Sequence, residues 1–107
     1  GLLTGKYQNG AIPAGSRMSL SADLGGRKTP RAFEAVEAYA AIAERHGLDL
    51  AQMALAWCRT RPFMTSIIFG ATSVDQLEQL LPSAGLELSD EVLSDINDAH
   101  RLHPMPY

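Results

Sequence analysis

The 107-residue chain has a single cysteine, Cys58, and it lacks a long hydrophobic run and a starting methionine. One cysteine cannot form a disulfide within the chain. Because Cys58 lies in an apolar helical run, we interpret it as a buried thiol rather than a nucleophile. No apolar run reaches the roughly 18 residues that cross a bilayer, and no charged-then-apolar signal opens the sequence. We therefore expect a cytoplasmic protein with no membrane partner.

Basic residues are few and scattered: nine Lys and Arg face twelve Asp and Glu, giving a net charge of −3. Proteins that bind nucleic acid carry clustered basic surfaces, so the sequence predicts no nucleic-acid partner. His100 and His103 are spaced like a pair of metal ligands, but no third ligand lies nearby, and we expect no metal site. His46 is interpreted as a capping residue at the end of a helix rather than a catalytic one.

Three stretches carry clear helix signals. Thr29 precedes a proline and predicts a helix over about Pro30–His46 with a broad apolar face. Asp49 begins a second helix over about Leu50–Thr60, which is apolar nearly all the way round and is therefore expected in the interior. Ser89 caps a last helix.

A strand–glycine–helix unit lies between the second and the last of these helices. Met64–Phe69 is a short apolar, β-branched run that ends at Gly70 and predicts a buried strand of a parallel sheet. Ser73 and Gln76 have the spacing of a capping box and predict the start of a helix that packs against this sheet.

The turn at Gly70 is suited to anions, because glycine allows close approach and the helix start presents free N–H groups and a positive dipole end. The alternative is an ordinary strand-to-helix turn that binds nothing, and the spacing leaves both open. The Gly-, Ser- and Pro-rich residues 1–29 predict a long loop that carries Lys6 and Arg17. This loop either closes over an anionic ligand or is a mobile segment with solvated charge.

The single predicted strand has no partner in the chain, and an unpaired strand leaves its backbone groups unsatisfied. Either the missing strands belong to a segment outside this chain, or the chain pairs with copies of itself. Because the sequence begins abruptly at Gly1, we expect a truncated chain.

Several segments together resemble the C-terminal third of the aldo-keto reductases, above all their Tas-like and potassium-channel β-subunit-like group. The segments that carry this resemblance are Gly1–Tyr7, Pro13–Arg17, Ala43–Asp49, Ala51–Trp57 and Ile67–Leu77. The resemblance implies an α/β fold, namely the C-terminal fragment of a (β/α)8 TIM barrel, mostly helical as it stands, with one strand at about residues 64–69. Residues 1–107 would then belong to a single barrel domain, with 1–29 as the cofactor or lid loop and 30–107 as the last helices, the final strand and the tail.

The resemblance also implies NADPH as cofactor. By the family pattern, Lys6 and Arg17 are expected to contact its phosphates, since arginine offers a bidentate fork and lysine a point charge. The 2′-phosphate and the adenosine are expected to contact Gly70, Thr72, Gln76 and Gln79. The catalytic Asp, Tyr, Lys and His of similar proteins belong to earlier strands, so we expect no catalytic residue in this chain.

The function implied by the resemblance is the NADPH-binding portion of an oxidoreductase that reduces aldehydes or ketones, with a small carbonyl compound as substrate of the intact protein. One alternative is a non-catalytic helical assembly module, in which the fragment self-associates through its apolar faces. Another is a regulatory module that binds the cofactor and turns it over slowly.

Overall fold

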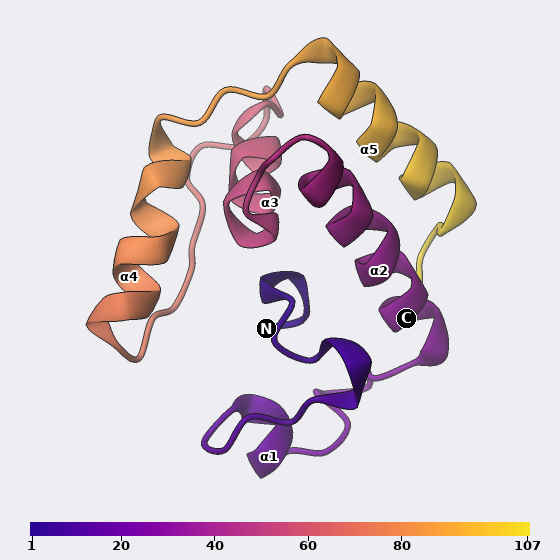
Figure 1. Cartoon of the computed structure of the whole chain (residues 1–107), viewed down its shortest axis with the longest axis vertical. Helices are drawn as coiled ribbons and strands as arrows, with labels where there is room; N and C mark the ends of the chain where they lie inside the picture. Colours follow the sequence, from indigo (N-terminus) through magenta and orange to yellow (C-terminus); the bar gives the residue numbers. More distant parts are fainter.

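The computed structural model describes all 107 residues, and they form helices joined by turns and extended segments, without a β-strand (Figure 1). The α-helices are α1 (Arg17–Leu20), α2 (Pro30–Arg45), α3 (Leu50–Arg59), α4 (Val74–Leu80) and α5 (Asp90–Leu102). Three short 3-10 helices complete the set: η1 (Leu2–Thr4), η2 (Gln8–Gly10) and η3 (Leu81–Ala84). No helix combines the length and the apolar character needed to cross a membrane.

The four longer helices begin where the sequence predicts, because a side-chain oxygen caps each N-terminus. The caps are Thr29, Asp49, Ser73 and Ser89, and each accepts a hydrogen bond from the backbone N–H three residues further on, at 3.0, 2.9, 3.2 and 3.3 Å respectively. A cap satisfies one of the N–H groups that have no partner inside the helix, so the start of each helix is fixed locally.

The strand expected at Met64–Phe69 is absent, and that part of the prediction is wrong. Between Thr65 and Ala71 no backbone N–H or C=O makes a hydrogen bond. A strand exists only when a second strand supplies these bonds, and the rest of the chain has folded into helices. Its expected burial is also wrong, since Ile68 is 96% exposed.

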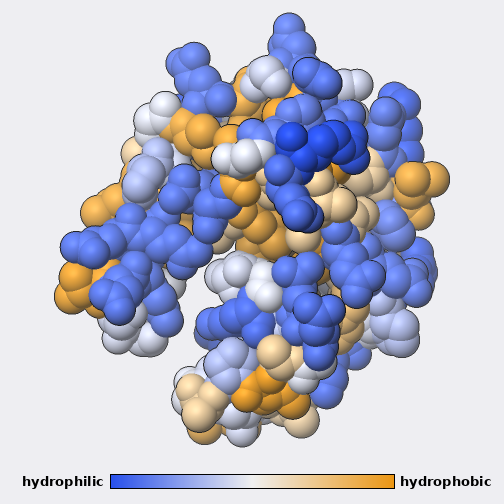
Figure 2. Space-filling model, viewed as in Figure 1, coloured by the Kyte–Doolittle hydropathy of each residue, from blue (hydrophilic) through white to orange (hydrophobic).

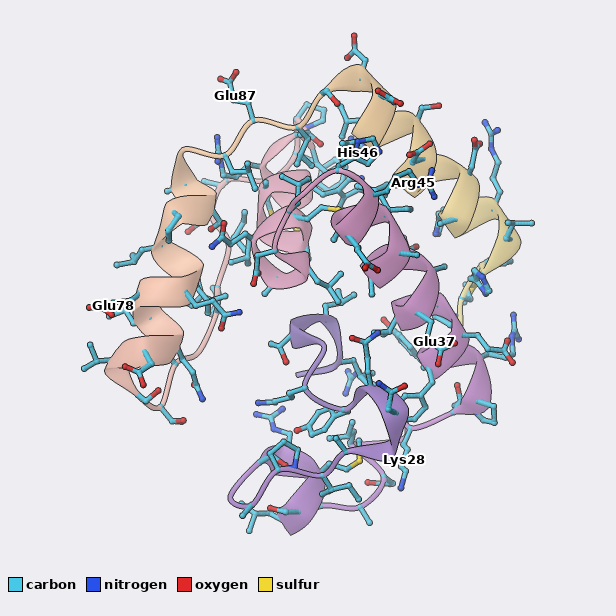
Figure 3. All side chains as sticks on the ribbon, viewed as in Figure 1. Lys28, Glu37, Arg45, His46, Glu78 and Glu87 are labelled. Atoms are coloured by element: carbon cyan, nitrogen blue, oxygen red, sulfur yellow. The ribbon has the colours of Figure 1, made fainter.

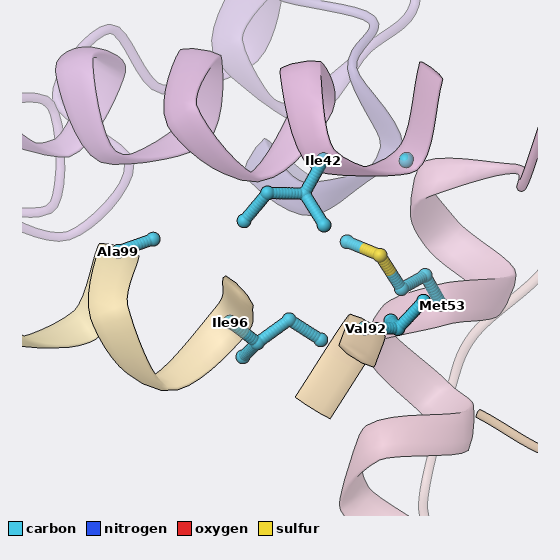
Figure 4. Packing of buried hydrophobic residues seen from close by; sticks show 6 residues of the cluster. Ile42, Met53, Val92, Ile96 and Ala99 are labelled. Carbon is cyan, nitrogen blue, oxygen red and sulfur yellow. The ribbon is translucent and has the colours of Figure 1, made fainter. Parts of the chain in front are cut away.

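The core lies where α2, α3 and α5 meet (Figure 4). Its buried members are Ile42, Ala43, Met53, Val92, Ile96 and Ala99. The alanines allow close approach of the helices, while the larger side chains fill the space between them. α3 buries Ala51, Met53 and Ala56, whereas Leu55 and Cys58 are only half-buried. The expected enclosure of this helix on nearly all sides is therefore not met within this chain.

Asp95 links the end of α2 to α5. Its Oδ2 lies 2.8 Å from Nε2 of His46 and 3.1 Å from Nη1 of Arg45. Arg45 lies in the last turn of α2 and His46 is its C-cap residue, and both are on the side that meets α5 (Figure 3). His46 thus has the structural place at the helix end that the sequence indicates.

A second buried cluster holds the N-terminal loop against α2. Tyr7, Met18 and Leu24 form its centre, with Leu2 and Phe33 packed against them. Phe33 lies in α2, so the loop of residues 1–29 is attached to the helical core rather than free of it. This attachment determines where the basic residues of the loop lie.

Candidate cofactor site

The six predicted cofactor residues fall into two groups on different parts of the fold. Lys6 and Arg17 belong to the N-terminal loop, while the other four belong to the segment that leads into α4 and to α4 itself. Figure 2 shows the α4 region and the N-terminal loop as two lobes with an open hollow between them. Nothing in this chain fills that hollow.

Tyr7 organises the first group. Its ring is only 2% exposed, and its hydroxyl accepts a hydrogen bond from the backbone N–H of Met18 at 3.2 Å. Met18 follows Arg17 directly, and Lys6 places its Nζ 5.5 Å from the centre of the Tyr7 ring. The two basic residues predicted to contact phosphate are therefore held around one buried side chain.

The basic residues also affect the pKa of Tyr7. Burial opposes ionisation of its phenol, but the Met18 amide and the positive charges of Lys6 and Arg17 together lower its pKa below the ordinary value of 10.0. Neither cation forms an ion pair, because the pairs in the structure join Arg45 and His46 to Asp95, and Arg101 to Asp98. Two positive charges that both act on Tyr7, and that form no ion pair, favour binding of an anion.

The second group is partly occupied by its own contacts. Thr72 donates from its backbone N–H and from its hydroxyl to Oε1 of Gln76, at 3.0 and 3.2 Å. Gly70 is exposed, and a methyl group added to its Cα would meet no atom within 4 Å. Packing within the chain therefore does not require glycine at this position, and the space beside it is open to a ligand.

Gln79 joins α4 to the start of α3. Its Nε2 donates to Oδ2 of Asp49 at 2.9 Å, and its backbone C=O accepts from Nε2 of Gln52 at 2.7 Å. No hydrogen bond involves Oε1 of Gln79, so an acceptor remains available on this side chain. The sequence does not indicate the link to Asp49, because the two residues are 30 positions apart and neither shows a local signal.

Two neighbouring cavities, which share Thr4 and Leu50 in their walls, are lined by one residue of each group. One of about 590 Å³ is mostly apolar and lies between Ile67–Gly70, α3 and α5, with Gly1, Leu3 and Thr4 at its edge. The other, about 740 Å³, is an open depression that Lys6 lines together with Glu37 and Glu44. Gly70 and Lys6 thus face different spaces, and this chain does not bring the two predicted halves of the site into one cavity.

The chain belongs to the aldo/keto reductase family, whose family model matches residues 1–101. Among its relatives, "Protein tas" of Escherichia coli (strain K12) is 48% identical over 106 residues, which cover 99% of this chain and 31% of the relative. The resemblance seen in the sequence motifs is thereby confirmed.

Two further relatives carry descriptive names. A probable voltage-gated potassium channel subunit beta of Arabidopsis thaliana is 40% identical over 82 residues, or 74% of this chain and 25% of the relative. L-glyceraldehyde 3-phosphate reductase of Escherichia coli O157:H7 is 35% identical over 103 residues, or 91% of this chain and 30% of that enzyme. The chain spans less than a third of the length of each of these relatives.

Proposed function

We propose that residues 1–107 form the C-terminal part of a single (β/α)8 barrel domain in an aldo/keto reductase that uses NADPH to reduce aldehydes or ketones. In this proposal residues 1–29 are the cofactor or lid loop, and residues 30–107 supply the last helices, the final strand and the tail. Membership of the family supports it, as does a relative named for reducing L-glyceraldehyde 3-phosphate, which is an aldehyde.

The observation that carries the proposal is the pair of cations near Tyr7, Lys6 and Arg17, neither of which forms an ion pair. In charge and in geometry of donors, Lys6 and Arg17 suit the phosphates of NADPH: the guanidinium donates two parallel hydrogen bonds and the ammonium supplies a point charge. Lys6 also borders a depression that is lined by carboxylates. Because carboxylates repel a phosphate, we place the cofactor on the other side of Lys6, toward Arg17.

The adenosine end of the cofactor is assigned to the segment before α4 and to α4. Gly70 leaves open space for it, and Thr72 and Gln76 would contact the 2′-phosphate and ribose in place of the two hydrogen bonds that Thr72 donates to Gln76. Oε1 of Gln79 would accept from the amino group of adenine while its Nε2 donates to Asp49. These residues bind and orient, and we place no catalytic residue in this chain; the nicotinamide supplies a hydride when the cofactor is bound.

The unpaired segment Thr65–Ala71 supports the barrel. The backbone N–H and C=O groups of these seven consecutive residues make no hydrogen bond on either side of the segment. Neighbouring parallel strands would supply those bonds and cover Ile68 and Phe69. Such pairing would also place the carboxyl end of this strand, at Gly70, at the face of the barrel where ligands bind.

A hybrid protein tests the proposal directly. The aligned region of the Escherichia coli L-glyceraldehyde 3-phosphate reductase is replaced by this chain, and NADPH binding and reductase activity are compared with those of the unaltered enzyme. We expect both to be retained. The double substitution Lys6→Ala, Arg17→Ala should abolish most of the binding, and Lys28→Ala, an exposed charge of the same loop, should not. A folded hybrid that ignores NADPH, or a double variant that binds like the hybrid, would refute the assignment.

A second candidate, non-catalytic self-association, rests on a different observation. Phe63 and Ile68 are 77% and 96% exposed beside the unpaired backbone, so a second copy of the chain is able to pair there. The two candidates differ in their response to NADPH. Assembly that forms without the cofactor and does not change on its addition favours the second.

A further inference from the structure

The C-terminal tail returns from the end of α5 to the start of α2 and is hydrogen-bonded there (Figure 1). The hydroxyl of Thr29 donates to the backbone C=O of Pro106 at 2.6 Å. The guanidinium of Arg31 donates to the C=O of Pro104 at 2.9 Å. These bonds join residues 77 and 73 positions apart, so they are tertiary contacts and not features of a local turn.

Backbone acceptors, rather than apolar burial, hold this tail. Met105 and Tyr107 are 81% and 69% exposed, and Met105 has a φ of 45°, a conformation that L-residues rarely adopt. Pro104 and Pro106 have no N–H, so they offer only the carbonyl groups that Arg31 and Thr29 use. The ring of Tyr107 adds one more contact, at 5.9 Å from the guanidinium carbon of Arg27.

Thr29 therefore makes two hydrogen bonds with one hydroxyl. Its oxygen accepts from the N–H of Ala32 at 3.0 Å, which caps α2, and its hydrogen is donated to Pro106. Thr29 is also the last residue of the loop that carries Arg17. The loop is also attached by the Tyr7–Met18 hydrogen bond and by Leu24, which is buried in the cluster that contacts Phe33 of α2.

We propose that residues 104–107 act as a strap that holds the loop Arg17–Lys28 against α2, and that Thr29 is the positioning residue through which the strap acts. The inference rests on the proposed function only where it concerns Arg17, whose approach to a cofactor phosphate depends on the place of this loop. The strap itself follows from the hydrogen bonds of Thr29 and Arg31.

Substitutions at Thr29 separate the strap from the helix cap. In Thr29→Asp the carboxylate still accepts from the N–H of Ala32 but has no hydrogen to donate to Pro106. Thr29→Ser keeps both hydrogen bonds. Deleting residues 104–107 removes the strap and leaves the cap intact, and Arg101→Ala, which removes an exposed ion pair on the last turn of α5, serves as a matched control.

Hydrogen–deuterium exchange of the full chain measures the outcome. Two reporters are loop amides bonded within the loop: Leu24 N–H to Ser21 C=O and Lys28 N–H to Asp23 C=O. We expect their exchange to become about two- to tenfold faster in Thr29→Asp and in the deletion, as the loss of one neutral hydrogen bond implies. Thr29→Ser and Arg101→Ala should match the unaltered chain, and so should the amide of Ala56 in α3 in every variant.

Three results would overturn the proposal: loop exchange unchanged in Thr29→Asp and in the deletion, equal acceleration in Thr29→Ser, or equal acceleration at Ala56, which signals general destabilisation. NADPH titration of the same variants separates this inference from the proposed function. A loop that loosens as expected, in a chain and hybrid protein that never bind NADPH, leaves the strap standing and removes the cofactor role. NADPH binding, combined with loop exchange that does not change in the variants, supports the cofactor role and removes the strap.

Discussion

The hydroxyl of Tyr7 accepts its hydrogen bond from the backbone N–H of Met18 across eleven positions of the sequence, inside a buried cluster. Tyr7 is the largest fully buried side chain of the molecule. This hydrogen bond joins the backbone beside Arg17 to the residue beside Lys6, so it closes the first half of the N-terminal loop. The candidate phosphate contacts depend on a residue that is itself not exposed to ligand.

Tyr7→Phe should lower the free energy of unfolding by about 1 to 3 kcal/mol, because the Met18 N–H is left buried without an acceptor. Tyr39→Phe is the matched control, since Tyr39 is half-buried in α2 and its hydroxyl makes no hydrogen bond to the protein; we expect a change below about 0.5 kcal/mol. Urea unfolding followed by circular dichroism measures both. Equal effects of the two substitutions would show that the Met18 contact contributes nothing particular.

The helix starts could be predicted from sequence because their cause is local. Thr29, Asp49, Ser73 and Ser89 cap helices through N–H groups only three residues away, and this spacing is visible in the sequence. The strand at Met64–Phe69 failed for the opposite reason. Its composition indicates a preference for extended backbone, but strand formation depends on a partner that no local pattern reveals.

The candidate site divides in the same way. Residue patterns indicate an anion preference at the turn after Gly70, while the specific roles of Lys6, Arg17 and Gln79 come from family resemblance. Neither source indicates that Gln79 binds Asp49 or that Lys6 and Gly70 border different cavities. Both features depend on how distant parts of the chain pack together, and only the folded structure defines that packing.

Gly47→Ala should destabilise the chain by about 1 kcal/mol, because Gly47 ends α2 with a φ of +65°, which costs an L-residue energy. Around it, the N–H of Leu48 donates to the C=O of Ala43 at 2.8 Å, as in a Schellman motif. Gly85→Ala is the control: its φ is −103°, and an added methyl group at either glycine meets no atom within 4 Å. Thermal unfolding that shifts equally for both variants would contradict the conformational explanation.

Asp23 should report on the loop at acid pH. The backbone N–H of Gly25 donates to its carboxylate at 3.0 Å and is the main cause that lowers the pKa of Asp23 below 3.8, with the Ser21 hydroxyl adding to it. Since the folded pKa is lowered, the interaction is present above the unfolded pKa and is lost as pH falls through the folded one. The Gly25 amide resonance should therefore titrate with a midpoint below 3.8, and in Asp23→Asn it should stay flat. A midpoint at or above 3.8 would rule out the hydrogen bond in solution.

The 107-residue chain should self-associate as its concentration rises, because Ile68 and Phe63 expose apolar surface beside unpaired backbone. Ile68→Glu places a charge on this surface and should shift the sedimentation profile toward the monomer. Leu102→Glu puts the same charge at another exposed apolar position, 78% exposed at the end of α5, and should leave association unchanged. A chain that remains monomeric at high concentration, or a response that is equal for both variants, would exclude the unpaired segment as the interface.

Arg17→Ala should weaken NADPH binding to the hybrid protein far more than NADH binding, if Arg17 contacts the 2′-phosphate that only NADPH carries. Loss of one charge-assisted hydrogen bond typically costs about 1.5 to 3 kcal/mol, which is about ten- to a hundredfold in affinity. Arg17 has no carboxylate partner to release, so this loss reflects the ligand contact rather than a disrupted ion pair. Fluorescence titration of both cofactors measures the effect, with Lys28→Ala as the control for the general charge of the loop. An equal loss for NADPH and NADH would move Arg17 from the 2′-phosphate to the pyrophosphate, and no loss for either would remove it from the site.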